Sequence, residues 1–145
     1  RMNSPPSLAF LIVDGNNVIH AWSDLLELHR KRRGLAHLEL CRRLREFNDQ
    51  SDYRVVVVFD GKRSKFSEER EPGGFQIVYT DGASTADDVI ERLASKYAKQ
   101  YRLVVATDDA AEQSLVSAMG AEVWSAQLLR DTIDRSSGNW RKWLK

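Results

Sequence analysis

Five short segments of the chain have the hydrophobic pattern of buried strands. A run that is apolar on both faces is typical of a strand inside a parallel sheet, because helices cover such a sheet on both sides. The first, second and fourth of these segments stop directly before an aspartate or before a Thr-Asp pair. The predicted strands are 8–13, 54–59, 75–79, 103–106 and 122–124.

Between these segments the apolar residues recur every three or four positions, which is the spacing of an amphipathic helix. Trp22 and its apolar neighbours predict one helix that starts at Asn16 and is broken by Arg30–Gly34. Ser84 and Thr85 are expected to cap a later helix, and Gly120 to end another. The predicted helices are 16–28, 35–47, 86–99, 110–119 and 126–133, and residues 62–74 are predicted to form an exposed loop.

Strands that alternate with helices favour right-handed crossovers and therefore a mostly parallel α/β sheet. The chain has 145 residues, a common size for one domain, and no segment has the composition of a linker. We expect a single domain over residues 8–134, preceded by a flexible leader (1–7) and followed by a tail (135–145).

Composition narrows the classes of protein further. The 22 basic and 21 acidic residues nearly cancel, but a nucleic-acid partner is not excluded, because clustering of charge matters more than its sum. Cys41 is the only cysteine, so no intrachain disulfide can form and a reduced, cytoplasmic setting is expected. The longest apolar run, Val55–Phe59, is far shorter than the ~20 residues that span a bilayer, so no membrane association is expected.

Acidic residues recur where predicted strands end. Asp14, Asp60 and Asp108 follow three strands, and Asp87 lies in the first turn of a predicted helix. Because ligands of open parallel sheets bind at the carboxyl ends of the strands, we expect these four side chains to converge there. One such aspartate alone is more often a turn former or a helix cap, but the coincidence of several is informative. Asp88 and Asp109 adjoin two of the four and are second choices.

Carboxylates that converge in this way repel one another unless a cation neutralises them. Mg²⁺ and Mn²⁺ prefer oxygen ligands of this kind, so either ion is the expected cofactor, held by Asp14, Asp87 and Asp108. No competing catalytic set is evident: His20, His29 and His37 lie in helical or basic stretches, and no serine follows the pattern of a nucleophile elbow.

Basic residues gather in two places that could contact phosphates. Lys62, Arg63 and Lys65 come directly after Asp60, and the run Arg30–Arg33 ends the first predicted helix. Phosphate contacts supply most nonspecific affinity for nucleic acid. The candidate RNA-binding residues are Lys62, Arg63, Lys65, Arg30, Arg32 and Arg33, although a solvated surface is an almost equal interpretation for the second group.

Four motifs in order, VDGNNVIHAW, VVVVFDG, TADDVIERL and VVATDD, resemble the YacP-like NYN domains, which belong to the PIN-like nucleases. The resemblance covers about residues 8–133. It implies a PIN-like three-layer fold with a central, mostly parallel five-stranded sheet in the order 3-2-1-4-5. It also implies Mg²⁺- or Mn²⁺-dependent cleavage of RNA. Asn16 departs from the family, which often has an aromatic residue there. The catalytic residues that the resemblance implies are Asp14, Asp60, Asp87, Asp108 and Asn17.

Other protein classes with strand-end aspartates fit less well. A phosphoacceptor receiver domain needs an acidic pair after the first strand and a lysine after the fifth, and an aspartate phosphotransferase needs Asp-x-Asp; neither pattern is present. A non-catalytic RNA-binding module on a nuclease-like fold is harder to exclude. We therefore expect a metal-dependent endoribonuclease, with mRNA on the ribosome as one candidate target.

Overall fold

The computed structural model describes residues 9–32, 34–63 and 67–137, and of residues 62–63 the backbone alone. Its strands form one six-stranded sheet in the order β3-β4-β2-β1-β5-β6. Neighbouring strands are parallel except β3, which pairs antiparallel with β4 at the sheet edge. The strands are β1 (Ala9–Asp14), β2 (Tyr53–Arg63), β3 (Ser67–Arg70), β4 (Gln76–Asp81), β5 (Arg102–Ala106) and β6 (Glu122–Trp124).

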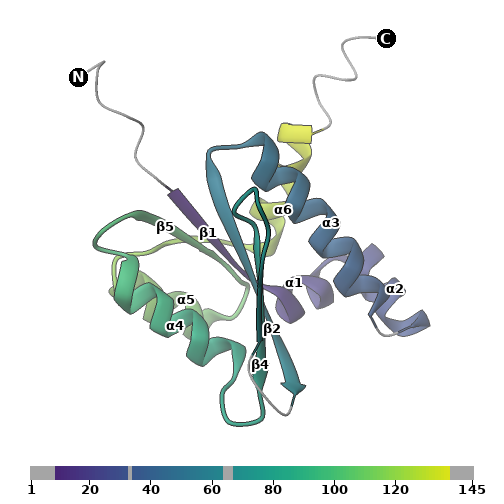
Figure 1. The fold of residues 1–145 in the computed structure, drawn as a ribbon, viewed down its shortest axis with the longest axis horizontal. Helices are drawn as coiled ribbons and strands as arrows, with labels where there is room; N and C mark the ends of the chain where they lie inside the picture. The colour runs from purple at the N-terminus through teal and green to yellow at the C-terminus, as the bar shows by residue number, and fades with distance from the viewer. Residues whose placement is uncertain (1–8, 33, 64–66, 138–145) are drawn as a thin grey trace.

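Helices cover both faces of this sheet and give the fold three layers (Figure 1). Helices α1, α2, α3 and α6 pack on one face, and α4 and α5 pack on the other. The helices are α1 (Gly15–Ala21), α2 (Ser23–Lys31), α3 (Leu35–Gln50), α4 (Ala86–Tyr97), α5 (Ala110–Ala118) and α6 (Ala126–Ser137). None of the helices in the described part of the chain has the length and apolar character to cross a membrane.

The strands are apolar throughout because successive side chains point to opposite faces and both faces are covered. On β1, Leu11 and Val13 pack against the α3 side, whereas Ile12 between them packs against α4 and α5. All three side chains are buried. The central strand is therefore held from both sides, and its end at Asp14 has a fixed position.

The first predicted helix is divided in the structure. Trp22 separates α1 from α2 and has an extended backbone. Its indole ring is buried, and Nε1 donates a hydrogen bond to the carbonyl oxygen of Ala126 in α6. A straight helix would need helical dihedrals at this residue, so the break follows from a long-range contact that helical periodicity cannot reveal.

The prediction of a loop at 62–74, and with it the five-strand count, was wrong. Strand β2 continues to Arg63 and β3 adds a sixth strand. The residues of β3 are mostly exposed, because an edge strand that lies outside the helical layers needs no apolar alternation. The other five strands keep the expected relative order. Helices α3 and α6 are longer than expected, and α6 includes residues 135–137, which were assigned to the tail.

Candidate active site

Asp14 ends the central strand and is the most buried of the strand-end carboxylates, with 6% of its surface exposed. Its Oδ2 accepts a hydrogen bond of 3.0 Å from the hydroxyl of Thr107, at the end of the neighbouring strand β5. The next residue, Gly15, needs to be glycine, because a Cβ atom at this position would overlap the ring of Phe59 on β2. Packing thus fixes both the backbone and the carboxylate at this point.

The two aspartates after β5 point in different directions. Asp109 caps α5, since its Oδ1 accepts hydrogen bonds from the backbone N–H groups of Ala111 and Glu112. Asp108 is exposed, and its Oδ1 accepts from the backbone N–H of Ala126, the first residue of α6. Asn17, a predicted site residue, accepts from the backbone N–H of Asp108 through its Oδ1. Asn17 therefore holds the loop after β5 in place.

The start of α4 carries the next acidic pair, and the two members again differ. Asp88 belongs to a capping box: Thr85 accepts from the backbone N–H of Asp88, and Asp88 accepts from that of Thr85. Asp87 has no such capping role and lies partly buried. The cap predicted at Ser84–Thr85 is confirmed, with Thr85 as the N-cap residue.

Asp60, on β2, is held from the neighbouring strand β4. The hydroxyl of Thr80, which is fully buried, donates a hydrogen bond of 3.1 Å to Oδ1 of Asp60 and accepts one from the backbone N–H of Gly61. Asp60 was predicted to follow the end of its strand, but it lies within β2, which continues to Arg63. Asp14 and Asp60 each accept a hydrogen bond from a buried threonine.

Electrostatics show which carboxylates lie close to one another. The pKa of Asp14 is raised from 3.8 to about 6. Burial is the largest cause, and the negative charges of Asp87 and Asp109 add to it, against the lowering effect of hydrogen bonds from Thr107 and the backbone of Asn17. The pKa of Asp87 is also raised, first by burial and then by the charges of Asp109, Glu91, Asp88 and Asp60. Asp14, Asp60, Asp87 and Asp109 therefore form one mutually repelling group, and Asp108 is not among the main causes of either shift.

The sequence patterns missed a further member of this group. Glu112, in the first turn of α5, has 1% of its surface exposed, and its Oε2 has no hydrogen-bond partner. Burial, a hydrogen bond with Glu91, and the charges of Asp87 and Asp14 raise its pKa well above the usual range for a carboxyl group. Helical spacing could have revealed both residues: Glu91 lies four positions after Asp87, and Glu112 three after Asp109. We call Asp14, Asp60, Asp87, Glu91, Asp109 and Glu112 the acidic cluster.

The acidic cluster fits a hard divalent cation by its chemistry, although its side chains are not already arranged around one. Its donors are all carboxylate oxygens, and an orphaned buried oxygen, Oε2 of Glu112, is among them. In the described residues no Lys or Arg forms an ion pair with the cluster. Nor does any group of three or more acidic, histidine or cysteine side chains there have metal-ligating geometry. A bound ion would have to draw the carboxylates inward or be bridged by water.

The predicted RNA-binding residues are described only in part. Arg30 and Arg32 are exposed at the end of α2. Lys62 and Arg63 continue β2, but the structure describes only their backbone. Arg33 and Lys65 lie outside the described residues. The role of all six in RNA binding stays a prediction.

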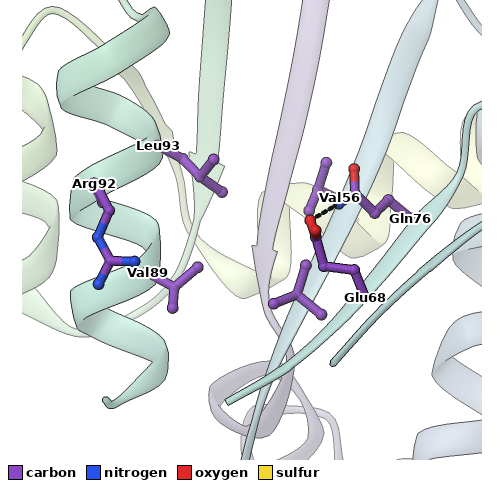
Figure 2. A pocket seen from close by; sticks show the side chains of 7 residues that line it. Val56, Glu68, Gln76, Val89, Arg92 and Leu93 are labelled. Atoms are coloured by element: carbon purple, nitrogen blue, oxygen red, sulfur yellow. Dashed lines mark hydrogen bonds between the residues drawn. The ribbon is translucent and has the colours of Figure 1, made fainter. Parts of the chain in front are cut away.

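Two hollows lie in the described surface. The larger, of about 920 Å³, borders the acidic cluster at Asp60 and runs along the α2–α3 connection; we call it the histidine groove, since His29 and His37 line it. The smaller, of about 130 Å³, lies between α4 and the edge of the sheet, as Figure 2 shows. Its walls are Val89, Arg92 and Leu93 of α4, facing strand residues that include Glu68 and Gln76, which are hydrogen-bonded to each other. None of the acidic cluster lines this smaller hollow.

Comparison with known proteins agrees with this architecture. The sequence profile described as YacP-like NYN domain matches residues 11–145. The chain belongs to the YacP-like NYN domain family. It is 35% identical to the protein YacP of Bacillus subtilis (strain 168) over 130 residues, which cover 86% of this chain and 76% of that protein. The family is nuclease-like, which indicates an RNA-related function.

Solved structures of a YacP protein have the same fold. The crystal structure of Rae1 (YacP) from Bacillus subtilis has a TM-score of 0.75 and 28% identity, covering 93% of this chain and 79% of that one. Its W164L mutant has a TM-score of 0.73 and 30% identity, covering 87% and 74%. The α/β architecture with a mostly parallel sheet is therefore shared within the family.

Proposed function

We propose that this chain is a metal-dependent endoribonuclease that hydrolyses RNA phosphodiester bonds, with the acidic cluster as its active site. One observation carries the proposal: carboxylates gather beside the end of β1, the pKa values of Asp14, Asp87 and Glu112 are raised, and no described cationic side chain pairs with them. A folded protein keeps such an arrangement at a cost in stability, which is a common property of active sites. Membership of a nuclease-like family supports RNA as the substrate class.

Asp14, Asp87 and Asp109 are the proposed ligands of Mg²⁺ or Mn²⁺, with Asp60 binding directly or through water. Asp109 takes the place first assigned to Asp108, because its charge acts on both Asp14 and Asp87 whereas the carboxylate of Asp108 caps α6. The cap that Asp109 makes on α5 uses Oδ1 for both of its hydrogen bonds, so Oδ2 is available for a ligand.

A bound divalent ion would lower the pKa of water so that hydroxide forms at neutral pH, and would offset charge on the leaving oxygen. The protein's own groups prepare this chemistry. Thr107 and Thr80 donate hydrogen bonds that orient the carboxylates of Asp14 and Asp60. The buried Glu112 lies close enough to Asp87 and Asp14 for their charges to raise its pKa. Because water is the nucleophile, the 2′-hydroxyl is not needed, and the products carry 5′-phosphate and 3′-hydroxyl ends.

Incubating the protein with structured and unstructured RNA in Mg²⁺, Mn²⁺ or EDTA, and mapping the product ends, tests the proposal. We expect cleavage with either metal, none in EDTA, and 5′-phosphate products. Cyclic 2′,3′-phosphate ends or full activity in EDTA would contradict the metal mechanism. Tight RNA binding without cleavage under every condition would instead favour a non-catalytic RNA-binding module. Fragments of mRNA and ribosome-bound mRNA are both suitable substrates for the assay.

A further inference from the structure

The histidine groove has properties that the hydrolytic chemistry does not use. One wall is the α2–α3 connection, where Gly34 adopts a left-handed conformation that lets α3 turn back along α2. The other wall is formed by β2 and β4, through Phe59 and Tyr79. Its volume of about 920 Å³ lies within the range of ligand-binding pockets, ~300–1,000 Å³. The groove is large enough for at least one nucleotide.

Aromatic rings form a continuous row along this groove. The ring of His37 lies edge-on to Phe59, with centroids 4.4 Å apart, and Phe59 stacks on Tyr79 at 5.6 Å. His29 extends the row from α2, with its ring 6.2 Å from that of His37. Beside the row, Leu38 is 70% exposed, the highest value among the large apolar side chains of the described residues. Flat rings next to an exposed apolar side chain are what an unpaired nucleobase stacks on.

Two polar atoms in the groove wall are without partners. Oδ1 of Asn16 and Nδ1 of His29 are buried and make no hydrogen bond within the protein. Buried polar groups are normally hydrogen-bonded, so two polar atoms without a partner in the lining of one groove need an explanation. The edge of a nucleobase carries both donors and acceptors and can supply the missing partners after a small side-chain rotation.

The positive charge beside the groove and its connection with the acidic cluster also favour a nucleic-acid strand as the ligand. Arg32 lines the groove, and Arg30 and Lys31 are exposed on the last turn of α2. Asp60 lines the groove and also acts on the pKa of Asp87, so the groove opens directly onto the acidic cluster. A chain whose bases enter the groove therefore has cations near its phosphates and its backbone near the carboxylates.

We propose that the histidine groove binds an unpaired base of single-stranded RNA next to the bond to be cleaved, an inference that rests on the proposed function. The base stacks against His37, whose ring rests on the buried Phe59, and contacts Leu38. A duplex cannot use this groove in the same way, because its bases are stacked on one another and show side chains only their edges. The groove thus selects single-stranded RNA over duplex.

Fluorescence anisotropy in EDTA measures this binding without any cleavage. The probes are a mixed-sequence single-stranded 12-mer RNA and the same strand annealed to its complement. Leu38→Asp is expected to weaken binding of the single strand about tenfold, since one base contact is lost. The matched control is Leu115→Asp, because Leu115 on α5 is also exposed (45%), lies outside the groove, and gains the same charge. This control should leave affinity within about twofold of wild type.

A second pair of variants separates stacking from folding effects. His37→Ala should weaken binding of the single strand, and His37→Phe, which keeps a flat ring, should restore it. Equal affinity of wild type for single strand and duplex, or equal weakening by Leu38→Asp and Leu115→Asp, would overturn the groove as a base site. Groove-dependent binding by a protein that cleaves no RNA in Mn²⁺ would support the groove while contradicting the proposed function, so the two failures are distinguishable.

Discussion

Acidic residues occupy two contrasting regions of this molecule. Between α2, α3 and α6, Asp24 accepts hydrogen bonds from Arg130 at 2.8 Å and from Arg43 at 2.6 Å, and these arginines lower its pKa well below the usual range. Glu39 is paired with Arg42 and Arg43, and its pKa falls to about 2. At the strand ends, by contrast, burial and mutual repulsion raise the pKa of Asp14.

The contrast separates two uses of a carboxylate. Where carboxylates hold helices together, the chain supplies arginines to neutralise them. In the acidic cluster no described residue supplies a cation, although this region is more deeply buried and the need for one is greater. Protonation relieves this repulsion in part, as the raised pKa values show, and a divalent cation from solution would neutralise the carboxylates that stay ionised. This is the basis of the metal proposal.

The largest expected effect comes from removing the central carboxylate. Asp14→Asn should lower the cleavage rate on the order of 10³-fold, since a metal ligand contributes several kcal/mol to the transition state. RNA binding in EDTA should be largely retained, because the loss of a negative charge favours the approach of phosphates. Single-turnover cleavage and anisotropy measure the two properties. Asp24→Asn is the control from the arginine-paired region, and a comparable loss of cleavage there would contradict the distinction.

The second prediction distinguishes the two aspartates after β5. Asparagine can replace aspartate as a helix cap, so neither Asp108→Asn nor Asp109→Asn should unfold the protein. Asp109→Asn should lower the cleavage rate about 100-fold, whereas Asp108→Asn should change it little. Cleavage kinetics at saturating Mn²⁺, with melting temperatures as a check on folding, measure the difference. If Asp108→Asn is the inactive variant, the assignment is reversed.

Stability should depend on pH in opposite directions in the two regions. The folded-state pKa of Asp14 is raised to about 6, so the protonated side chain contributes to the free energy of unfolding. This contribution is fully present below the ordinary pKa of 3.8 and is lost as pH rises through about 6. This shift corresponds to a loss of about 3 kcal/mol in the metal-free protein. Asp24 and Glu39 have lowered pKa values and lose their contribution only in acid.

Urea unfolding in EDTA between pH 5 and pH 7 tests the acidic cluster through the difference in slope between wild type and Asp14→Asn, because the arginine-paired carboxylates stay ionised over that range. Burial and the neighbouring His29 lower the pKa of His37, and this opposite contribution is common to both proteins. We expect stability to fall with rising pH, and Asp14→Asn to flatten the slope. A slope that Asp14→Asn leaves unchanged would mean that burial does not destabilise the ionised carboxylate of Asp14.

The smallest effect is expected in the arginine-paired region itself. Asp24→Asn should reduce the free energy of unfolding by about 1 kcal/mol or less, because the side chain is 42% exposed and solvent screens its ion pairs. The loss should be the same with and without Mn²⁺. Urea unfolding under both conditions measures it, and a loss that depends on Mn²⁺ would link Asp24 to the metal.

The sequence predicted what depends on local periodicity. Apolar runs located the parallel strands, because burial on both faces leaves a plain signal. The end of the first run located Asp14 correctly, whereas the second run ends at Phe59 although its strand, β2, continues to Arg63. Trp22 broke a predicted helix through a contact with Ala126, more than a hundred residues away, and no periodicity carries that information. The exposed edge strand β3 was missed because its residues make no apolar alternation.

The sequence located the candidate site to pairs of neighbouring aspartates, but it did not show which carboxylate of each pair faces the site. Both Asp108 and Asp109 follow β5, and both accept hydrogen bonds at the start of a helix. Only the charge effect of Asp109 on Asp14 and Asp87 separates the two, and it depends on the folded arrangement. Helical spacing places Glu112 on the same side of α5 as Asp109, but its burial depends on how α5 packs against α4, which the sequence does not show. The histidines had no recognisable spacing, and their row appears only when α2, α3 and β2 are brought together.

Uptake of a divalent ion by the acidic cluster is the central claim, and a thermal unfolding titration tests it most directly. The melting temperature of wild type is measured at neutral pH in EDTA and in increasing Mn²⁺ or Mg²⁺, beside Asp14→Asn and Asp24→Asn. We predict that either ion raises the melting temperature of wild type and of Asp24→Asn, because binding to the folded state alone stabilises it. Asp14→Asn should start more stable in EDTA and respond little. No shift in wild type, or an equal shift in Asp14→Asn, would contradict the account.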